Sequence, residues 1–431
     1  MYRKEVFPMK KSLMITVSSV FMAALLLSTA ACTSGNGTTK ETVSYQATLT
    51  AQTISPFPEA FVAGMNQYGW KAASNLYSGE NLAISPASLE LAILMTRTGA
   101  LGDTAEEMKD ALSMSSMSDE EILLACKQLM WRANTNGMEA ANSIWMQKDY
   151  TFSEDFIKAC TDKFMADAFA VNFLTDAAGA TDSINKWASD KTHGKIPEMN
   201  PEPLPTDTRL VLINALYFLG DWEVPFLAET SYDDIFHGSK SEATVPFMHD
   251  SRDMLYAESP TYQMISMPFK GSKDGQDSPY SMAFILPDDG QDVAAVMDKL
   301  ATEGFSAAAS ELSIEKVQLS LPKFEFTFDA SMVKTMQDLG MKLAFDGENA
   351  RFDGMTDSDN DLYITDILHK CYIRVDEKGA EAAAVTEVVV GVTSMPVEED
   401  LKIFTADRPY LFAIYDETDN SILFLGAVGQ L

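Results

Sequence analysis

Two runs after the first third of the chain carry apolar side chains at odd and even positions alike. They are LVLINALYFL at residues 210–219 and YSMAFILP at residues 280–287. Runs that are apolar on both faces predict strands buried on both faces, in the centre of a sheet. Apolar residues alternate on one parity over residues 317–321 and on the other over residues 324–328, which predicts a bend between them. The C-terminal segment, residues 410–428, predicts a hairpin with a polar loop.

The first third of the chain predicts helices instead. Apolar residues recur at helical spacing from Phe61, and Ser85 followed by Pro86 fits an N-cap and a first helical position. TAEE at residues 104–107 and SDEE at residues 118–121 both fit a capping box. Further helix starts are predicted at Ser153 and Thr181. Helices first and strands later predict an α+β fold with large antiparallel sheets.

Composition limits the classes of function. The 431 residues are 46% apolar and 22% charged, which is typical of a globular protein with a large core. No linker rich in Pro, Gly or Ser follows the first fifty-odd residues, so we expect one large domain over residues 56–431. The net charge of −31 argues against nucleic-acid binding, which needs clustered Lys and Arg.

The N-terminus predicts an export signal. Lys10 and Lys11 precede an apolar run at residues 13–27, and the run is followed by STAAC, which ends at Cys32. The stretch LSTAAC resembles a bacterial lipoprotein cleavage site, although it has Thr where that family usually has Leu. We expect a signal peptide at residues 1–31, lipidation of Cys32 and a flexible tether at residues 32–55. A plain secretory signal ending near residue 31 is the alternative, and translation could start at residue 1 or 9.

Motifs of enzymes, metal sites and nucleotide sites are missing from the sequence. There is no GxSxG, HExxH or P-loop, and the acidic run at residues 357–361 lacks the glycine of a calcium loop. We therefore expect no catalytic residue, no metal and no cofactor. The three cysteines after Cys32 have no CxxC spacing, so buried free thiols are expected. Among the four histidines, His369 is interpreted as a hydrogen-bonded structural residue.

Residues 377–390, EKGAEAAAVTEVVV, combine helix-forming Ala and Glu with strand-forming Val and Thr. Divided by parity, the even positions from 380 to 392 are all small or apolar, whereas Glu381 and Glu387 both fall on odd positions. A strand built from this segment would have one buried face and one solvent face. An ordinary sheet strand and an Ala-rich helix broken at Thr386 are alternatives on the pattern alone.

This segment and motifs elsewhere in the chain resemble those of the serpins. The resemblance runs from about residue 56 to residue 431. The family's motifs occur in order, so the resemblance is specific. They are NLAISPAS at 81–88, GALGDTAEEM at 99–108, ANSIWMQKDY at 141–150, INKWASDKTHGKI at 184–196, LINALYFLGDWEVPF at 212–226, LPKFEF at 321–326, LHKCYIRVDEKGAEAAAVT at 368–386 and ADRPYLFAI at 406–414.

The resemblance implies helices packed on three mostly antiparallel sheets, with an exposed reactive-centre loop. It also implies a suicide inhibitor: a protease cuts the loop and is trapped as an acyl-enzyme while the hinge inserts into the main sheet as a new strand. It assigns three groups of residues. The hinge is Glu377, Gly379, Ala380, Glu381, Ala382, Ala383 and Ala384, the shutter is Ser85, Ser88, Asn214 and His369, and the breach is Trp222 and Lys323, with Lys323 paired to Glu377.

Counting sixteen residues from Glu377, as the family does, predicts the reactive bond at Thr393–Ser394. Cleavage after Val392 or Met395 is the alternative. No Lys or Arg occurs over residues 379–401, which disfavours trypsin-like enzymes. Elastase-like, subtilisin-like or papain-like proteases are expected instead.

The partner implied by the resemblance is therefore a serine or cysteine protease, held in a covalent complex. The inhibitor itself is expected to be a monomer that meets a membrane only through its N-terminal lipid. We expect an exported bacterial protein, displayed on the outer membrane or cell surface or else secreted or periplasmic. A non-inhibitory carrier or chaperone of the cell envelope is the main alternative, and an envelope hydrolase is a more distant one.

Overall fold

The computed structural model describes residues 56–134, 138–271, 278–356, 362–380 and 401–431. These residues all belong to one compact unit, Thr42–Leu431. Within the described residues no helix is both long and apolar enough to cross a bilayer. The α-helices are α1 Glu59–Leu76, α2 Pro86–Arg97, α3 Gly102–Ala111, α4 Asp119–Ala133, α5 Glu154–Lys163, α6 Phe173–Lys191, α7 Val293–Glu303, α8 Phe305–Ser310 and α9 Val333–Asp338.

The strands of the described residues form three sheets. The large sheet has the order β1-β16-β15-β9-β8-β7-β10-β14, with β6 paired to β7. Its members are β1 Leu82–Ile84, β6 Tyr232–His237, β7 Glu242–Glu258, β8 Tyr262–Pro268, β9 Tyr280–Pro287, β10 Ser313–Pro322, β14 Lys402–Thr405, β15 Tyr410–Asp416 and β16 Ser421–Val428. The second sheet is β3 Ala166–Val171, β2 Met138–Gln147 and β4 Leu210–Phe218, and the third is β11 Phe324–Ser331, β12 Leu368–Val375, β13 Gly379–Ala380 and β5 Gly220–Asp221. The α+β class and the mostly antiparallel sheets are confirmed.

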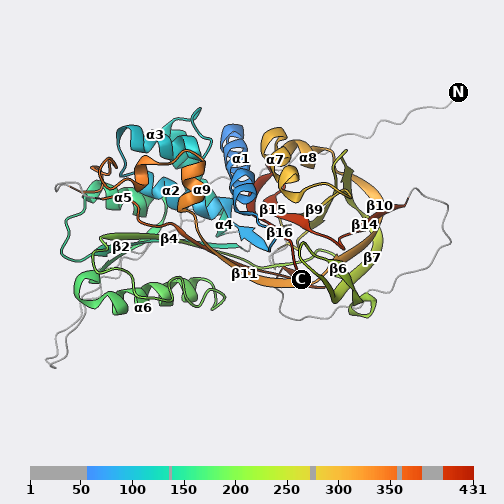
Figure 1. Cartoon of the computed structure of the whole chain (residues 1–431). Helices are drawn as coiled ribbons and strands as arrows, with labels where there is room; N and C mark the ends of the chain where they lie inside the picture. The colour runs from blue at the N-terminus through green and yellow to red at the C-terminus, as the bar shows by residue number, and fades with distance from the viewer. Residues whose placement is uncertain (1–55, 135–137, 272–277, 357–361, 381–400) are drawn as a thin grey trace, which may run out of the picture. The chain divides into compact units, whose positions relative to one another are not determined.

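Helices cover both faces of the β3-β2-β4 sheet. In Figure 1, α6 lies on one side of β2 and β4, while α2 and α4 lie on the other. A small aromatic core beneath α6 includes Trp145, which stacks on Phe169 at 4.1 Å between ring centroids and meets Trp187 edge to face. The larger core is continuous from α1 to β16 and fills the space between the helices and the large sheet.

Several predicted helix starts are confirmed, and two are wrong. Ser85 caps α2, and Ser118 forms the predicted capping box of α4. Helix α3, however, begins at Gly102, so Thr104 lies inside it and its Oγ1 accepts the backbone N–H of Arg351. Helix α6 begins at Phe173 rather than near Thr181, because Asn172 caps it.

The predicted strands occur where the sequence indicated them, but their neighbours differ in one case. The bend after Leu321 is a switch between sheets, because β10 ends at Pro322 and β11 begins at Phe324. Strand β9 is buried along its whole length, as predicted. Strand β4 was expected in the centre of a sheet, yet among the described residues it pairs only with β2 and has an unpaired edge.

Candidate functional site

The two residues of β13 connect β5 to β12. Gly379 pairs with Asp221 of β5, and Ala380 pairs both with Gly220 of β5 and with Val375 of β12, in antiparallel register. The Ala380 side chain is 4% exposed. Gly379 has to be glycine here, because a Cβ atom would lie 2.0 Å from the carbonyl oxygen of Gly220. The first residues of the predicted hinge therefore already form a short strand.

The segment after β5 holds the chain that leads into β13. Three successive carbonyl groups accept hydrogen bonds from it: the Trp222 indole N–H donates to Asp376 at 2.9 Å, the Phe226 N–H to Glu377 at 2.8 Å and the Trp222 N–H to Lys378 at 2.7 Å. The Trp222 ring is 1% exposed and stacks on Phe269 at 4.8 Å between centroids. These contacts fix the direction in which the chain enters the sheet.

An ion pair joins the same segment to the point where β10 turns into β11. Lys323 Nζ lies 3.0 Å from Glu377 Oε1, and both side chains are partly buried. Burial alone would raise the pKa of the Glu377 carboxyl, but hydrogen bonds from Lys323, the backbone and Ser231, with the charge of Lys323, together outweigh it, so the pKa is lowered from its ordinary value. The pair that the resemblance implied is thus present in the geometry.

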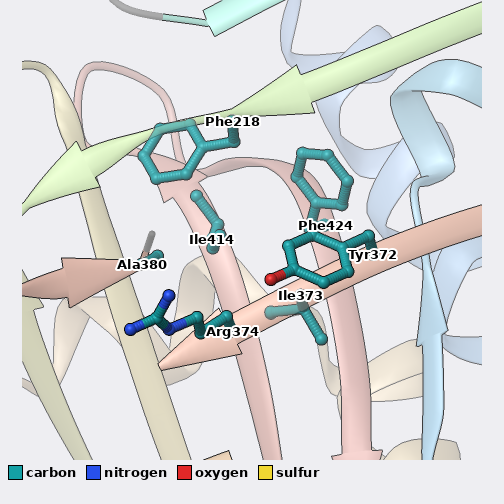
Figure 2. A pocket seen from close by; sticks show the side chains of 7 residues that line it. All are labelled: Phe218, Tyr372, Ile373, Arg374, Ala380, Ile414 and Phe424. Carbon is teal, nitrogen blue, oxygen red and sulfur yellow. The ribbon is translucent and has the colours of Figure 1, made fainter. Parts of the chain in front are cut away.

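A cleft lies between β4 and β12 beside Ala380. Figure 2 shows Phe218 on the β4 side and Tyr372, Ile373 and Arg374 on the β12 side of this cleft. Its remaining lining residues, Ile414 and Phe424, come from β15 and β16 of the large sheet. Strands β4 and β12 share no hydrogen-bonded register among the described residues, so both face the cleft with unpaired backbone groups.

The four predicted shutter residues fall into two groups, one around His369 of β12 and the other at Asn214 of β4. Ser85 Oγ accepts the Ser88 N–H at 3.1 Å and donates to the Leu423 carbonyl at 2.7 Å. The Ser85 N–H donates to His369 Nε2 at 3.0 Å, and Cys371 Sγ lies 3.1 Å from the same nitrogen. Burial lowers the pKa of His369 from 6.5 to about 4, against the opposing effect of the Asp329 charge. His369 is therefore a neutral acceptor, and it has the hydrogen bond that the sequence interpretation gave it.

Asn214 belongs to the other group. Its Nδ2 donates to Asn142 Oδ1 at 2.8 Å, within the β2–β4 pair. Its Oδ1 is buried and has no hydrogen-bond partner among the described residues. A buried amide oxygen without a hydrogen-bond donor is costly to the folded state.

The remaining predicted residues are outside the described parts of the chain. These are Cys32, Glu381, Ala382, Ala383, Ala384, Thr393 and Ser394. The acidic run at 357–361 also lies outside them. The sequence analysis assigned no role to Gly220 or Arg374. The glycine of the LGDW motif is the sequence signal that could have predicted the close contact between Gly220 and Gly379. Cys126, Cys160 and Cys371 are buried free thiols, and no cluster of three metal-ligating side chains occurs in the described ranges.

Comparisons with known proteins agree with this geometry. A family model described as "Serpin (serine protease inhibitor)" matches residues 64–431. The chain belongs to the serpin family. It is 32% identical over 355 residues to an uncharacterized serpin-like protein of Thermococcus kodakarensis, a match that covers 81% of this chain and 80% of the relative. It is also 32% identical to the leukocyte elastase inhibitor of Xenopus laevis, covering 80% of this chain and 92% of that one.

Among solved structures, this serpin is similar to tengpin, a thermophilic serpin. The native state of tengpin matches with a TM-score of 0.79 at 30% identity, covering 90% of this chain and 98% of tengpin. Its latent state gives a TM-score of 0.74. Relatives of this serpin are named as serpins and protease inhibitors rather than as enzymes.

Proposed function

We propose that this serpin is an irreversible suicide inhibitor of serine, and by the same chemistry cysteine, endopeptidases. The observation that carries the proposal is β13. This two-residue strand lies at one end of the cleft between β4 and β12, which do not pair with each other in the described structure. A protease cuts the loop near Thr393–Ser394. The freed segment then extends β13 along the cleft and carries the acyl-enzyme with it.

The register of β13 supports this extension. Ala380 pairs with Gly220 of β5 on one side and with Val375 of β12 on the other. If both antiparallel registers continue by two residues, Ala382 lies opposite Phe218 and Ile373. The same continuation brings Thr386 between Asn214 and His369, where a threonine hydroxyl would supply the donor that Asn214 Oδ1 lacks. Every even position up to 392 then meets the buried face, and those positions are the small and apolar ones.

The free energy of the extension is large enough to trap an enzyme. About a dozen residues would gain backbone hydrogen bonds, which at roughly 1 kcal/mol net for each bond is on the order of ten kcal/mol. The uncut chain is in that case kinetically trapped, with the loop unable to reach the cleft until it is cut.

Target preference follows from the loop sequence. Residues 379–401 contain no Lys or Arg. A trypsin-like protease, whose S1 pocket binds a cationic side chain, would therefore find no matching residue in the loop. We propose elastase-like, subtilisin-like or papain-like targets. The named relative that inhibits leukocyte elastase supports the first of these classes.

Incubation with subtilisin and with pancreatic elastase tests the inhibitory mechanism. We expect a complex that survives denaturing electrophoresis. We also expect a C-terminal peptide that is released on denaturation and whose mass gives the reactive bond. Ala384→Arg, on the inward parity, should turn the inhibitor into a substrate, whereas the matched Ala383→Arg, on the outward parity, should still trap the enzyme. Equal trapping by both variants would exclude strand insertion. A loop cut without any complex would favour a non-inhibitory binding protein.

We also propose that the protein is exported and anchored through Cys32, as a cell-surface or outer-membrane lipoprotein of a bacterium. The tether at residues 32–55 would keep the inhibitor clear of the membrane, and the net charge of −31 would keep it soluble and monomeric. Metabolic labelling with a radioactive fatty acid should mark the wild-type protein but not Cys32→Ala. Equal labelling of both proteins, or none of either, contradicts the lipid anchor.

A further inference from the structure

Three large aliphatic side chains lie on the same outer face of the large sheet, near its β14 edge. Ile314 of β10 is 74% exposed, Ile403 of β14 is 58% exposed, and Leu401, just before β14, is 44% exposed. The parallel register pairs Ile403 with Gln318, which shares the outer face of β10 with Ile314. We call these three residues the edge patch; β10 and β14 lie side by side in Figure 1.

Packing of the protein does not account for the edge patch. The core of this part of the sheet is supplied by the opposite parity, where Val317, Leu319 and Phe404 are fully buried. Exposed β-branched side chains on an edge strand invite unwanted pairing, and polar residues would serve the strand equally well on a solvent face. Aliphatic side chains at these positions therefore indicate a surface that becomes covered.

The charges around the edge patch suit an apolar partner. Lys316, between Ile314 and Gln318, lies 3.8 Å from Asp253 of β7. Lys402 pairs with the buried Val317, so it belongs to the other face of β14, where it lies 3.7 Å from Glu258. Although the chain as a whole is strongly acidic, the patch itself presents aliphatic surface, and the cation within it has a carboxylate close by.

The edge patch also lies within reach of an enzyme bound at the proposed reactive bond. Eight residues lead from Ser394 to Lys402, which at about 3.3 Å per extended residue gives a span of at most about 26 Å. A protease domain of about 250 residues has a radius of gyration of about 18 Å, so its surface extends over a comparable distance. The occupied side would be the one that binds the residues after the cut bond.

We propose that the edge patch is a second contact for the target protease, which meets it with an uncharged apolar surface beside its primed-side cleft. The inference rests on the proposed inhibitory function and adds the surface that accelerates docking. Contacts of this kind act before the loop is cut, so they raise the rate of loop cleavage and leave the later insertion step unchanged. A second copy of this chain and the N-terminal tether are the other occupants that the test distinguishes.

The decisive experiment uses Ala384→Arg as the parent protein, because in it the loop is cut without trapping, and kcat/KM then reports docking and loop cleavage without the insertion step. The patch variant adds Ile314→Thr, Leu401→Thr and Ile403→Thr, which keep strand propensity while removing aliphatic surface. With subtilisin and with pancreatic elastase, we expect kcat/KM for loop cleavage to fall about tenfold. A free peptide of residues 385–401 should be cut at the same rate with and without Leu401→Thr.

Matched variants separate a contact from a structural effect. Leu124→Gln with Leu174→Gln removes side chains that are 61% and 58% exposed on α4 and α6, and should leave kcat/KM at the parent value. A conservative patch with Ile314→Val, Leu401→Met and Ile403→Val should restore the parent rate. If the triple variant does not fold, Ile314→Lys alone should lower kcat/KM about threefold.

Parent-like cleavage of the patch variants by both enzymes overturns the proposal. The edge patch would then have another occupant. If that occupant is a second copy of the chain, the patch variant should self-associate more weakly than its parent. Binding of the tether to the patch would instead be detected by removing residues 32–55. If Ala384→Arg still traps protease, the proposed insertion mechanism fails instead. The patch comparison is then made on the rate of complex formation, where the same tenfold difference is expected.

Discussion

At the scale of single residues, the entry to the cleft depends on backbone contact rather than on side-chain chemistry. Gly379 and Gly220 approach so closely that a Cβ on Gly379 would overlap the Gly220 carbonyl. Gly379→Ala should therefore detach β13 from β5 and slow insertion, so that more inhibitor is cut for each enzyme trapped. We expect the stoichiometry of inhibition to rise severalfold in titrations of protease activity. Lys378→Ala is the control, because only its backbone contacts Trp222, and a rise of equal size in both variants would refute the steric argument.

His369 gives a pH dependence at the same scale. Its pKa is lowered by burial to about 4, so the unfolded chain binds the proton more readily than the folded one. Stability from this residue is present above pH 6.5 and is lost as the pH falls toward 4, by roughly 3 kcal/mol in all. His369→Asn should make the fall in melting temperature between pH 6.5 and 4 shallower than in wild type, whereas the exposed His237→Asn should not. Parallel curves for wild type and His369→Asn would contradict the assignment.

At the scale of elements, β4 and β12 face the cleft with edges that are unpaired in the described structure. Backbone amides on those edges should exchange with solvent faster than amides of β9 and β15, which have partners on both sides. After cleavage by a trapped protease, we expect exchange in β4 and β12 to slow by tenfold or more, while β9 and β15 stay unchanged. Hydrogen–deuterium exchange with mass spectrometry measures both. Unchanged exchange in β4 after complex formation would mean that no strand has entered beside it.

Elements also show where sequence patterns are sufficient and where they are not. The Ser118 capping box was predictable because its hydrogen bonds join residues three positions apart. The similar pattern at Thr104 failed because Glu107 instead accepts the N–H groups of Lys342 and Leu343, which are distant in sequence. The early start of α6 was missed for a related reason, since a break in helical geometry at Asp176 hides the Asn172 cap from a periodicity argument.

At the scale of the whole molecule, the order of motifs predicted the family and the fold, and the parity of residues 380–392 predicted a strand with one buried face. Neither could predict that Ala380 is already paired on both sides in the uncut chain, because that pairing depends on how far β5 lies from β12. Likewise, the open Asn214 oxygen is visible only once β2 and β4 are paired. What the sequence does not contain is the spacing between strands that are brought together from distant parts of the chain.

That spacing leads to a prediction for the molecule as a whole, that cutting one bond makes the fold more stable. A domain of residues 56–431 has an unfolding entropy of roughly 0.8 kcal/mol per kelvin, so about ten kcal/mol of new sheet should raise the melting temperature by at least roughly 10 °C. Differential scanning calorimetry of the protein cut by a non-target protease within the loop measures the rise directly. Cut Ala384→Arg is the control, since it has the same nick without an inserted strand and should melt near the uncut value. If nicked wild type also melted there, the cleft between β4 and β12 would not be the place where the hinge goes.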